Sequence, residues 1–161
     1  MSTNFDATVA AAGAPPAAGL VGLLARGRAL LERIPYSLLA LIARGAAFEV
    51  FWRSGQVKLD DWAGTIHLFE EEYKVPVIPP EIAAYLAAGM ELGGSVLLLA
   101  GLFSRAVALM FIGMVTVIQV FIYPEAWPTH IQWLAFLALL AARGPGLVSL
   151  DALVARWLSR R

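Results

Sequence analysis

Two stretches of the chain are each long and apolar enough to cross a lipid bilayer, and this feature constrains the fold more than any other. They run from about residue 80 to 103 and from about 105 to 123, close to the roughly 20 residues that a transmembrane helix needs. Of the 161 residues, 60% are hydrophobic and only 15% are charged, and a chain this short cannot hide so much apolar surface in a soluble core. The sequence therefore predicts a membrane protein.

Two further segments, 36–53 and 127–142, complete a set of four predicted spans. Both carry polar residues, which a membrane tolerates when they face the interior of a helix bundle. The connections at Ser104 and at 124–126 are short, so the last three spans are expected to be antiparallel neighbours. The predicted fold class is an all-α membrane protein, a four-helix transmembrane bundle over residues 36–153.

The remaining segments differ in composition from the spans. Residues 1–19 are small, polar or rich in Pro, Ala and Gly and are expected to be a disordered tail. Residues 20–35 set three arginines among leucines, a pattern that favours an amphipathic helix on the membrane surface. Residues 54–79 are expected to form a long outer loop with a short amphipathic helix over the mouth of the bundle, and 154–161 a basic tail.

The distribution of basic residues predicts the orientation. Eight of the 12 lysines and arginines fall in the N-terminal segment, the turn after Ser104 and the C-terminal tail, against three on the other side. The positive-inside rule then places both termini in the cytoplasm. Acidic and basic residues balance at 12 each, which gives no indication of a nucleic-acid partner. The absence of cysteine excludes thiol catalysis and thiolate metal sites.

Charged residues within spans are candidates for function because the bilayer makes them costly. Arg44 and Glu91 are each expected about 15 Å below the outer end of their spans, at 1.5 Å per residue. An opposite-charge pair at matched depth would stabilise both charges. The pair could belong to a ligand site or be a structural salt bridge between the first two spans, and the sequence leaves both interpretations open.

A second polar group is predicted nearer the outer surface. Glu49 and Arg53 have the i,i+4 spacing of a helical ion pair. The candidate pocket residues are Arg44, Glu49, Glu91, Gln119, His130 and Gln132. Such a pocket could hold a quinone headgroup, a small polar ligand or a metal. The alternative is that Arg53, His130 and Gln132 are simply hydrated at the interface.

A metal or haem site is the less favoured interpretation of His130. The only other histidine, His67, falls in the predicted outer loop, so a bis-histidine haem inside the bundle is not expected. The chain also has no Glu-x-x-His motif of the di-iron bundles. We therefore predict no metal site.

Several motifs together resemble the DoxX family of membrane proteins, over about residues 36–153. The strongest is GPGLVSLD directly after the last span, which contributes Gly144, Pro145, Gly146, Ser149, Leu150 and Asp151. Supporting it are the Arg44-Gly45 pair, Gly55 and Lys58 in or after the first span, and Glu91 followed by LLLAGLFSRAVAL. The segment LFEEEYKVPVIPPEIAAYLA is similar to one bacterial branch of that family.

The resemblance implies a small inner-membrane protein that accompanies a membrane redox enzyme, because the family takes its name from a subunit of a quinol oxidase complex. Such a subunit would bind a quinone-like ligand, with Arg44 contacting a ligand carbonyl or neutralising Glu91, and Glu91 relaying a proton. No covalently bound cofactor is expected, so stand-alone catalysis is not favoured. A non-catalytic scaffold, a transport or metal-handling component, and a homo-oligomer remain alternatives.

Overall fold

The computed structural model describes residues 19–75 and 77–161, which form helices and connecting turns without a β-strand. The chain divides into two compact units, one ending at Ile34 and one covering Pro35–Arg161. The first contains α1 (Leu20–Glu32), which occupies most of the predicted segment 20–35. Its position on a membrane surface stays a prediction, and the predicted tail, 1–19, falls outside the described residues except at its last position.

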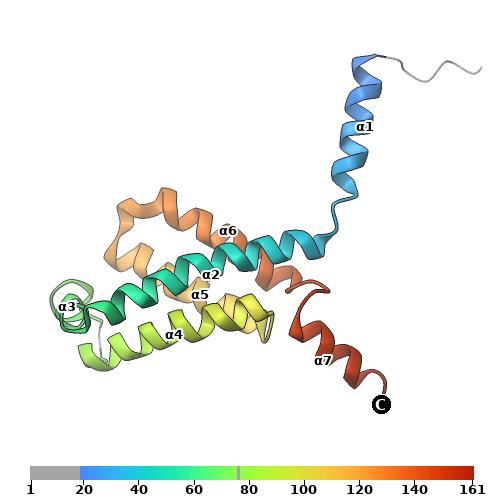
Figure 1. Ribbon diagram of the computed structural model, residues 1–161. Coiled ribbons are helices and arrows are strands. Elements are labelled where there is room, and N and C mark those ends of the chain that lie inside the picture. The colour runs from blue at the N-terminus through green and yellow to red at the C-terminus, as the bar shows by residue number, and fades with distance from the viewer. Residues whose placement is uncertain (1–18, 76) are drawn as a thin grey trace, which may run out of the picture. The chain divides into compact units, whose positions relative to one another are not determined.

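The second unit is built from four long helices and two shorter ones, joined by turns (Figure 1). The long helices are α2 (Tyr36–Asp60), α4 (Pro80–Ala100), α5 (Ser104–Val117) and α6 (Trp127–Arg143). The shorter ones are α3 (Trp62–Leu68) and α7 (Leu150–Leu158). A π-helical turn, Phe69–Tyr73, follows α3; another, Ile118–Ile122, continues α5; and a 3₁₀ turn, Pro124–Ala126, precedes α6.

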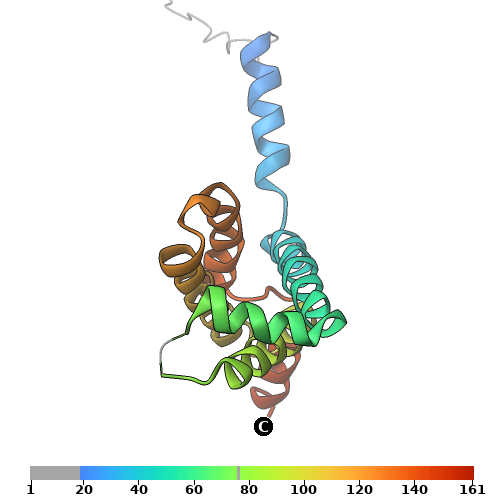
Figure 2. The ribbon, with the colours of Figure 1, turned by 90° about the vertical axis from the view of Figure 1, so that its left-hand side faces the viewer.

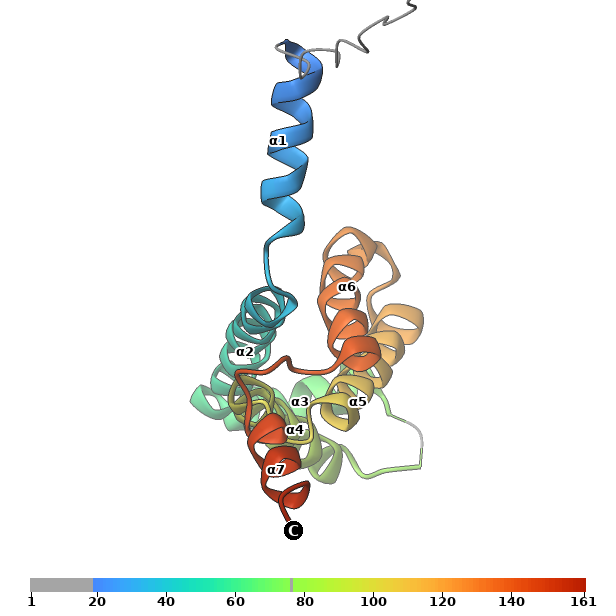
Figure 3. The same ribbon diagram turned by 90° about the vertical axis from the view of Figure 1, so that its right-hand side faces the viewer.

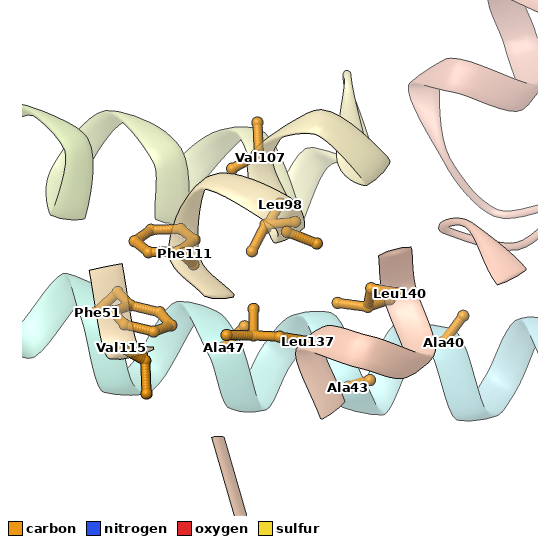
Figure 4. Close-up of a cluster of buried hydrophobic side chains, with 11 residues drawn as sticks. Ala40, Ala43, Ala47, Phe51, Leu98, Val107, Phe111, Val115, Leu137 and Leu140 are labelled. Atoms are coloured by element: carbon orange, nitrogen blue, oxygen red, sulfur yellow. The ribbon is translucent and has the colours of Figure 1, made fainter. Parts of the chain in front are cut away.

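The core of this unit lies where α2, α4, α5 and α6 meet (Figure 4). Alanines at 40, 43 and 47 line the buried face of α2 at helical spacing and let the neighbouring helices approach. Further along the same face, the ring of Phe51 stacks on Phe111 of α5 with 3.8 Å between ring centroids. Helix α4 packs along α2, and α6 packs on both α5 and α2. Small residues at one end and stacked aromatics in the middle therefore set the spacing of the helices.

The turn between α4 and α5 is bound to the start of α7. Gly101 has φ +72°, and a Cβ there would lie 2.5 Å from Cβ of Ser149, so only glycine fits. The Asp151 carboxylate accepts hydrogen bonds from the backbone N–H groups of Phe103 (2.8 Å) and Ser104 (3.0 Å) and so caps α5. Figure 3 shows this end of the unit, where the segment after α6 passes across to α7.

Length and hydropathy identify two helical segments as candidate membrane spans, Pro80–Ala100 and Ser104–Ile122. A third candidate arises when Leu20–Glu32 and Tyr36–Asp60 are taken together as one span. The apolar helices agree with a membrane protein, whereas the count of four spans stays a prediction.

Two predicted boundaries fall inside helices of the structure. The segment 54–79 is not one long loop: α2 continues through Asp60, and α3 lies across the ends of α2 and α4 (Figure 2). Polar residues after Arg53 suggested a loop, but they lie on a helix whose buried face continues through Gly55. The basic tail, 154–161, is mostly helical, because α7 ends only at Leu158.

Candidate functional site

A buried ion pair joins α2 to α4. Glu91 is 3% exposed, and its two carboxylate oxygens lie 2.9 and 2.8 Å from Nζ of Lys58. The Ser54 hydroxyl donates a hydrogen bond of 3.0 Å to the same carboxylate and accepts one from Lys58. Ser54 and Lys58 are one turn apart on α2, so both face α4 at this level. The carboxylate is thereby paired and hydrogen-bonded, as a buried charge requires.

Gly55 allows the two helices to come close beside this pair. A Cβ at Gly55 would lie 2.7 Å from Cγ of Leu92 and 3.3 Å from Cβ of Glu91. A larger residue would have to displace the side chain of Leu92 and press on that of Glu91. The glycine therefore positions the ion pair through backbone packing.

Arg44 does not pair with Glu91, contrary to the sequence-based prediction. Its guanidinium donates to four carbonyl oxygens, those of Leu98 (2.9 Å), Leu99, Pro145 (3.2 Å) and Val148 (2.5 Å). The prediction placed the outer end of the first span at Arg53, whereas α2 ends at Asp60, seven residues or about 10 Å further on. Arg44 therefore lies deeper than expected and meets the last turn of α4, where backbone carbonyls lack helical partners.

His130 is held by Gln119 next to the π-helical turn after α5. His130 is 4% exposed, and its Nδ1 lies 2.7 Å from Oε1 of Gln119. The amide nitrogen of Gln119 donates to the carbonyl of Pro124 at 2.7 Å, which fixes the orientation of the amide. Since Oε1 then accepts, Nδ1 of His130 carries a hydrogen, and this hydrogen bond leaves Nε2 unengaged.

Two tyrosines border the same region from the turns outside the spans. The Tyr123 hydroxyl donates to the Glu72 carboxylate, and the rings of Tyr73 and Tyr123 meet edge to face with centroids 6.1 Å apart. Burial raises the pKa of Tyr73, and the hydrogen bond to Glu72 raises the pKa of Tyr123, in both cases above the usual 10.0. Both phenols therefore keep their protons at neutral pH.

These groups surround a cavity of about 790 Å³, here called the Lys58–Glu91 cavity. Its walls are mainly apolar, with residues such as Phe51, Met110 and Trp133. The residues with charged groups, hydroxyl groups or an imidazole in its lining are Ser54, Lys58, Tyr73, Tyr85, Glu91, Tyr123 and His130. A mainly apolar cavity of this size with a few convergent polar groups is typical of a small-molecule site.

The sequence-predicted pocket residues are only partly brought together. Glu91 and His130 line the cavity, and Gln119 lies behind His130. Glu49, Arg53 and Gln132 are exposed and do not line it. The two ion pairs among residues 19–75 and 77–161 are Arg28–Glu32 and Lys58–Glu91, so the predicted Glu49–Arg53 pair is not formed. Gln132 instead donates to the carbonyl of Pro128 at 2.8 Å.

Ser54, Lys58, Tyr73 and Tyr123 were missed as site residues. For the first two, a signal was present, because the buried stripe of α2 continues at spacings of three and four from Phe51 to Gly55 and on to Lys58. The tyrosines reach the cavity from turns, whose geometry no periodicity predicts. Within the described part of the chain, no three acidic or histidine side chains gather closely enough to hold a metal ion.

Comparison with known proteins gives one match. The sequence model of the family described as DoxX matches residues 39–124, which is more than half of the chain and includes both partners of the buried ion pair. The Gly144–Asp151 motif lies outside the matched segment. No curated protein and no solved structure matches the chain.

Proposed function

Because this chain belongs to the DoxX family of small membrane proteins, we propose that it binds a quinone-like or other small amphipathic ligand in the Lys58–Glu91 cavity. In this proposal the protein is an accessory subunit of a membrane redox system, and a partner enzyme supplies the electron chemistry. The observation that carries the proposal is a buried ion pair on the wall of a mainly apolar cavity of about 790 Å³.

The polar lining suits an amphipathic ring with oxygen substituents. The Lys58 ammonium and the Tyr73 hydroxyl are donors for carbonyl oxygens, whereas Glu91 and His130 offer acceptors for hydroxyl groups. The Tyr123 hydroxyl already donates to Glu72 and offers the ligand only its oxygen as an acceptor. The apolar walls would hold the ring and the start of a hydrocarbon tail. Arg44, which was expected to contact the ligand, is engaged with backbone carbonyls, and the proposal assigns that donor role to Lys58 instead.

The proposal also includes four spans, α2, α4, α5 and α6, in a bacterial inner membrane with both termini in the cytoplasm. Five arginines at or beyond the ends of the helices support this orientation, since they gather near α7: Arg105, Arg143, Arg156, Arg160 and Arg161. The Lys58–Glu91 cavity would then open toward the outer half of the bilayer.

The experiment compares ligand retained by the wild type and by a variant that loses both charges together. Lys58→Gln with Glu91→Gln avoids leaving one buried charge without its partner, which would be strongly destabilising. Glu49→Gln with Arg53→Gln is the matched control, because it also removes one acidic and one basic charge, here from the exposed face of α2. Each protein is purified in a mild detergent, and its organic extract is analysed by mass spectrometry.

We expect a near-stoichiometric quinone or other lipid-like compound in the wild type and in the control, and its loss from the Lys58/Glu91 variant. Thermal melting in the same detergent checks that the variant is folded. The absence of any enriched compound from wild type, or its full retention by a folded Lys58/Glu91 variant, would refute the proposed site.

A second candidate function is a scaffold in which the ion pair only locks α2 to α4. The close approach at Gly55 and the hydrogen bond from Ser54 to Glu91 favour it, since both fasten the two helices together. This candidate predicts a lower melting temperature for the Lys58/Glu91 variant, with no compound enriched in either protein. The same experiment therefore separates the two functions.

A further inference from the structure

A second cavity, of about 780 Å³, lies at the other end of α2 from the Lys58–Glu91 pair. It is lined by the first residues of α2, the turn before α5, the segment after α6 and the start of α7. Two arginines border it, Arg105 from the first turn of α5 and Arg143 from the end of α6. We call it the arginine cavity.

The two guanidinium groups are held close to the same stretch of backbone. Gly144, directly after Arg143, has φ +80°, and a Cβ there would lie 3.3 Å from Nε of Arg105. Arg143 stacks over the ring of Tyr36, with its Cζ 4.3 Å from the ring centroid. The Tyr36 hydroxyl in turn donates to the Gly144 carbonyl at 2.6 Å. The glycine and the tyrosine thus position both cations.

The lining of the cavity carries two arginines against one acidic residue. The only acidic residue in its lining, Asp151, has both carboxylate oxygens engaged by the N–H groups of Phe103 and Ser104. Neither arginine belongs to an ion pair within the described ranges, 19–75 and 77–161. Two guanidinium groups beside one hydrogen-bonded carboxylate leave an excess of positive charge, which favours an anion, and the planar guanidinium matches the geometry of a phosphate.

The surroundings of the cavity select a lipid as the source of the phosphate. The cavity adjoins the turn between Pro80–Ala100 and Ser104–Ile122, the two candidate spans, so it lies at the level of the lipid headgroups. Phe103 and Leu147, both in the lining, are 66% and 71% exposed and offer apolar surface for acyl chains.

The composition of helix α7 also indicates that this end of the protein lies at the level of the lipid headgroups. Its exposed apolar residues repeat at helical spacing along one face, at 150, 153, 154, 157 and 158. Trp157 is among them, and the Arg161 guanidinium lies 3.8 Å from the centroid of its ring. An amphipathic helix with tryptophan and arginine at its end is typical of the interface between headgroups and acyl chains.

We propose that the arginine cavity binds the phosphate of an anionic phospholipid between Arg105 and Arg143, with the acyl chains against Phe103 and Leu147. The lipid would join the first turn of α2 to the α4–α5 turn and the segment after α6 at the membrane surface. This site is separate from the Lys58–Glu91 cavity, and the proposal does not depend on what that cavity binds.

The test measures which lipids stay bound to the purified protein. Wild type in detergent is incubated with mixed micelles of phosphatidylglycerol and phosphatidylcholine, and the bound lipid is identified by native mass spectrometry. The variant is Arg105→Gln with Arg143→Gln. The matched control is Arg160→Gln with Arg161→Gln, which removes the same charge from the end of the chain outside the cavity lining.

We expect wild type and control to retain phosphatidylglycerol over phosphatidylcholine, and the Arg105/Arg143 variant to retain about tenfold less, as the loss of two charge-assisted contacts implies. Where that variant melts before the binding step, Arg105→Lys with Arg143→Lys replaces it. Lysines keep the charge but lose the paired geometry, so retention should fall by about threefold or more.

Three results would overturn the proposal. The first is equal retention of phosphatidylglycerol by wild type and the folded Arg105/Arg143 variant. The second is an equal loss in the Arg160/Arg161 control, which would show that diffuse charge at the end of the chain attracts the lipid. The third is displacement of the lipid by excess inorganic phosphate, which would identify a site for free phosphate.

Discussion

Replacing Arg44 by methionine removes a guanidinium that donates to four backbone carbonyls while keeping a long unbranched side chain. The Leu98 carbonyl also accepts a hydrogen bond from the N–H of Gly101, so it keeps one partner. The other three carbonyls lose the partner that Arg44 provides: Leu99, Pro145 and Val148. At about 1–2 kcal/mol for each part-buried group, the free energy of unfolding should fall by about 3–6 kcal/mol. This is a large share of the typical 5–15 kcal/mol.

A double-mutant cycle shows which residue is the partner of Glu91. Arg44 reaches the carbonyl of Leu98, which is seven residues, or about 10 Å, along α4 from Glu91. Arg44→Met and Glu91→Gln should therefore have additive effects on the unfolding free energy, within about 0.5 kcal/mol. Lys58→Gln and Glu91→Gln should instead show a coupling of about 1–3 kcal/mol, because their charged groups are in contact.

The assay is equilibrium unfolding in mixed micelles with increasing sodium dodecyl sulfate, followed by far-UV circular dichroism. Arg44→Lys replaces the methionine variant if the latter does not fold, since lysine keeps one donor group at this position. A coupling between Arg44 and Glu91 as large as that between Lys58 and Glu91 would refute the described geometry. Such a result would restore the ion pair expected from the sequence.

Two other predictions concern the loops at either end of the helices. Gly146→Ala should lower the unfolding free energy by at least about 1–2 kcal/mol, because Gly146 has φ +79° and a Cβ there would lie 2.8 Å from Cα of Ser37. Gly113 has open space around it, so Gly113→Ala should leave the unfolding free energy unchanged or raise it by up to about 1 kcal/mol. Equal losses in both variants would contradict the steric argument. The raised pKa of Tyr123 predicts that its contribution to stability is complete below the unfolded value of about 10 and declines as the pH rises beyond it. Glu72→Gln should move the ultraviolet titration of Tyr123 toward that value, and an unchanged titration curve would show that the hydrogen bond to Glu72 does not cause the shift.

The sequence was most informative where composition alone determines structure. The spans predicted over 80–103 and 105–123 correspond to Pro80–Ala100 and Ser104–Ile122, since long apolar runs favour helices that bury their backbone groups. The end of the first span was missed because its last two turns carry polar residues. On that helix a narrow buried face is sufficient for packing, and it continues through Gly55.

The candidate site shows why charge and depth do not identify a partner. Arg44 and Glu91 were selected as charges within the predicted spans, and both are buried in the structure. The choice of partner depends on how α2 is aligned along α4. An error in the predicted end of a helix shifts this alignment by the same number of residues. Backbone carbonyls were also not considered, although a guanidinium with five N–H donors suits the end of a helix as well as a carboxylate.

The hydrogen bonds of Arg44 can be completed only late in the synthesis of this chain, because two of its acceptors lie after α6. The carbonyls of Leu98 and Leu99 emerge from the ribosome well before those of Pro145 and Val148, because chains are made from the N-terminus. Before the segment after α6 is synthesised, Arg44 has only two of its four carbonyl acceptors. The hydrogen bonds between α2 and that segment are then still missing. A chain stopped at residue 143 would thus carry a buried arginine that lacks two of its four carbonyl acceptors.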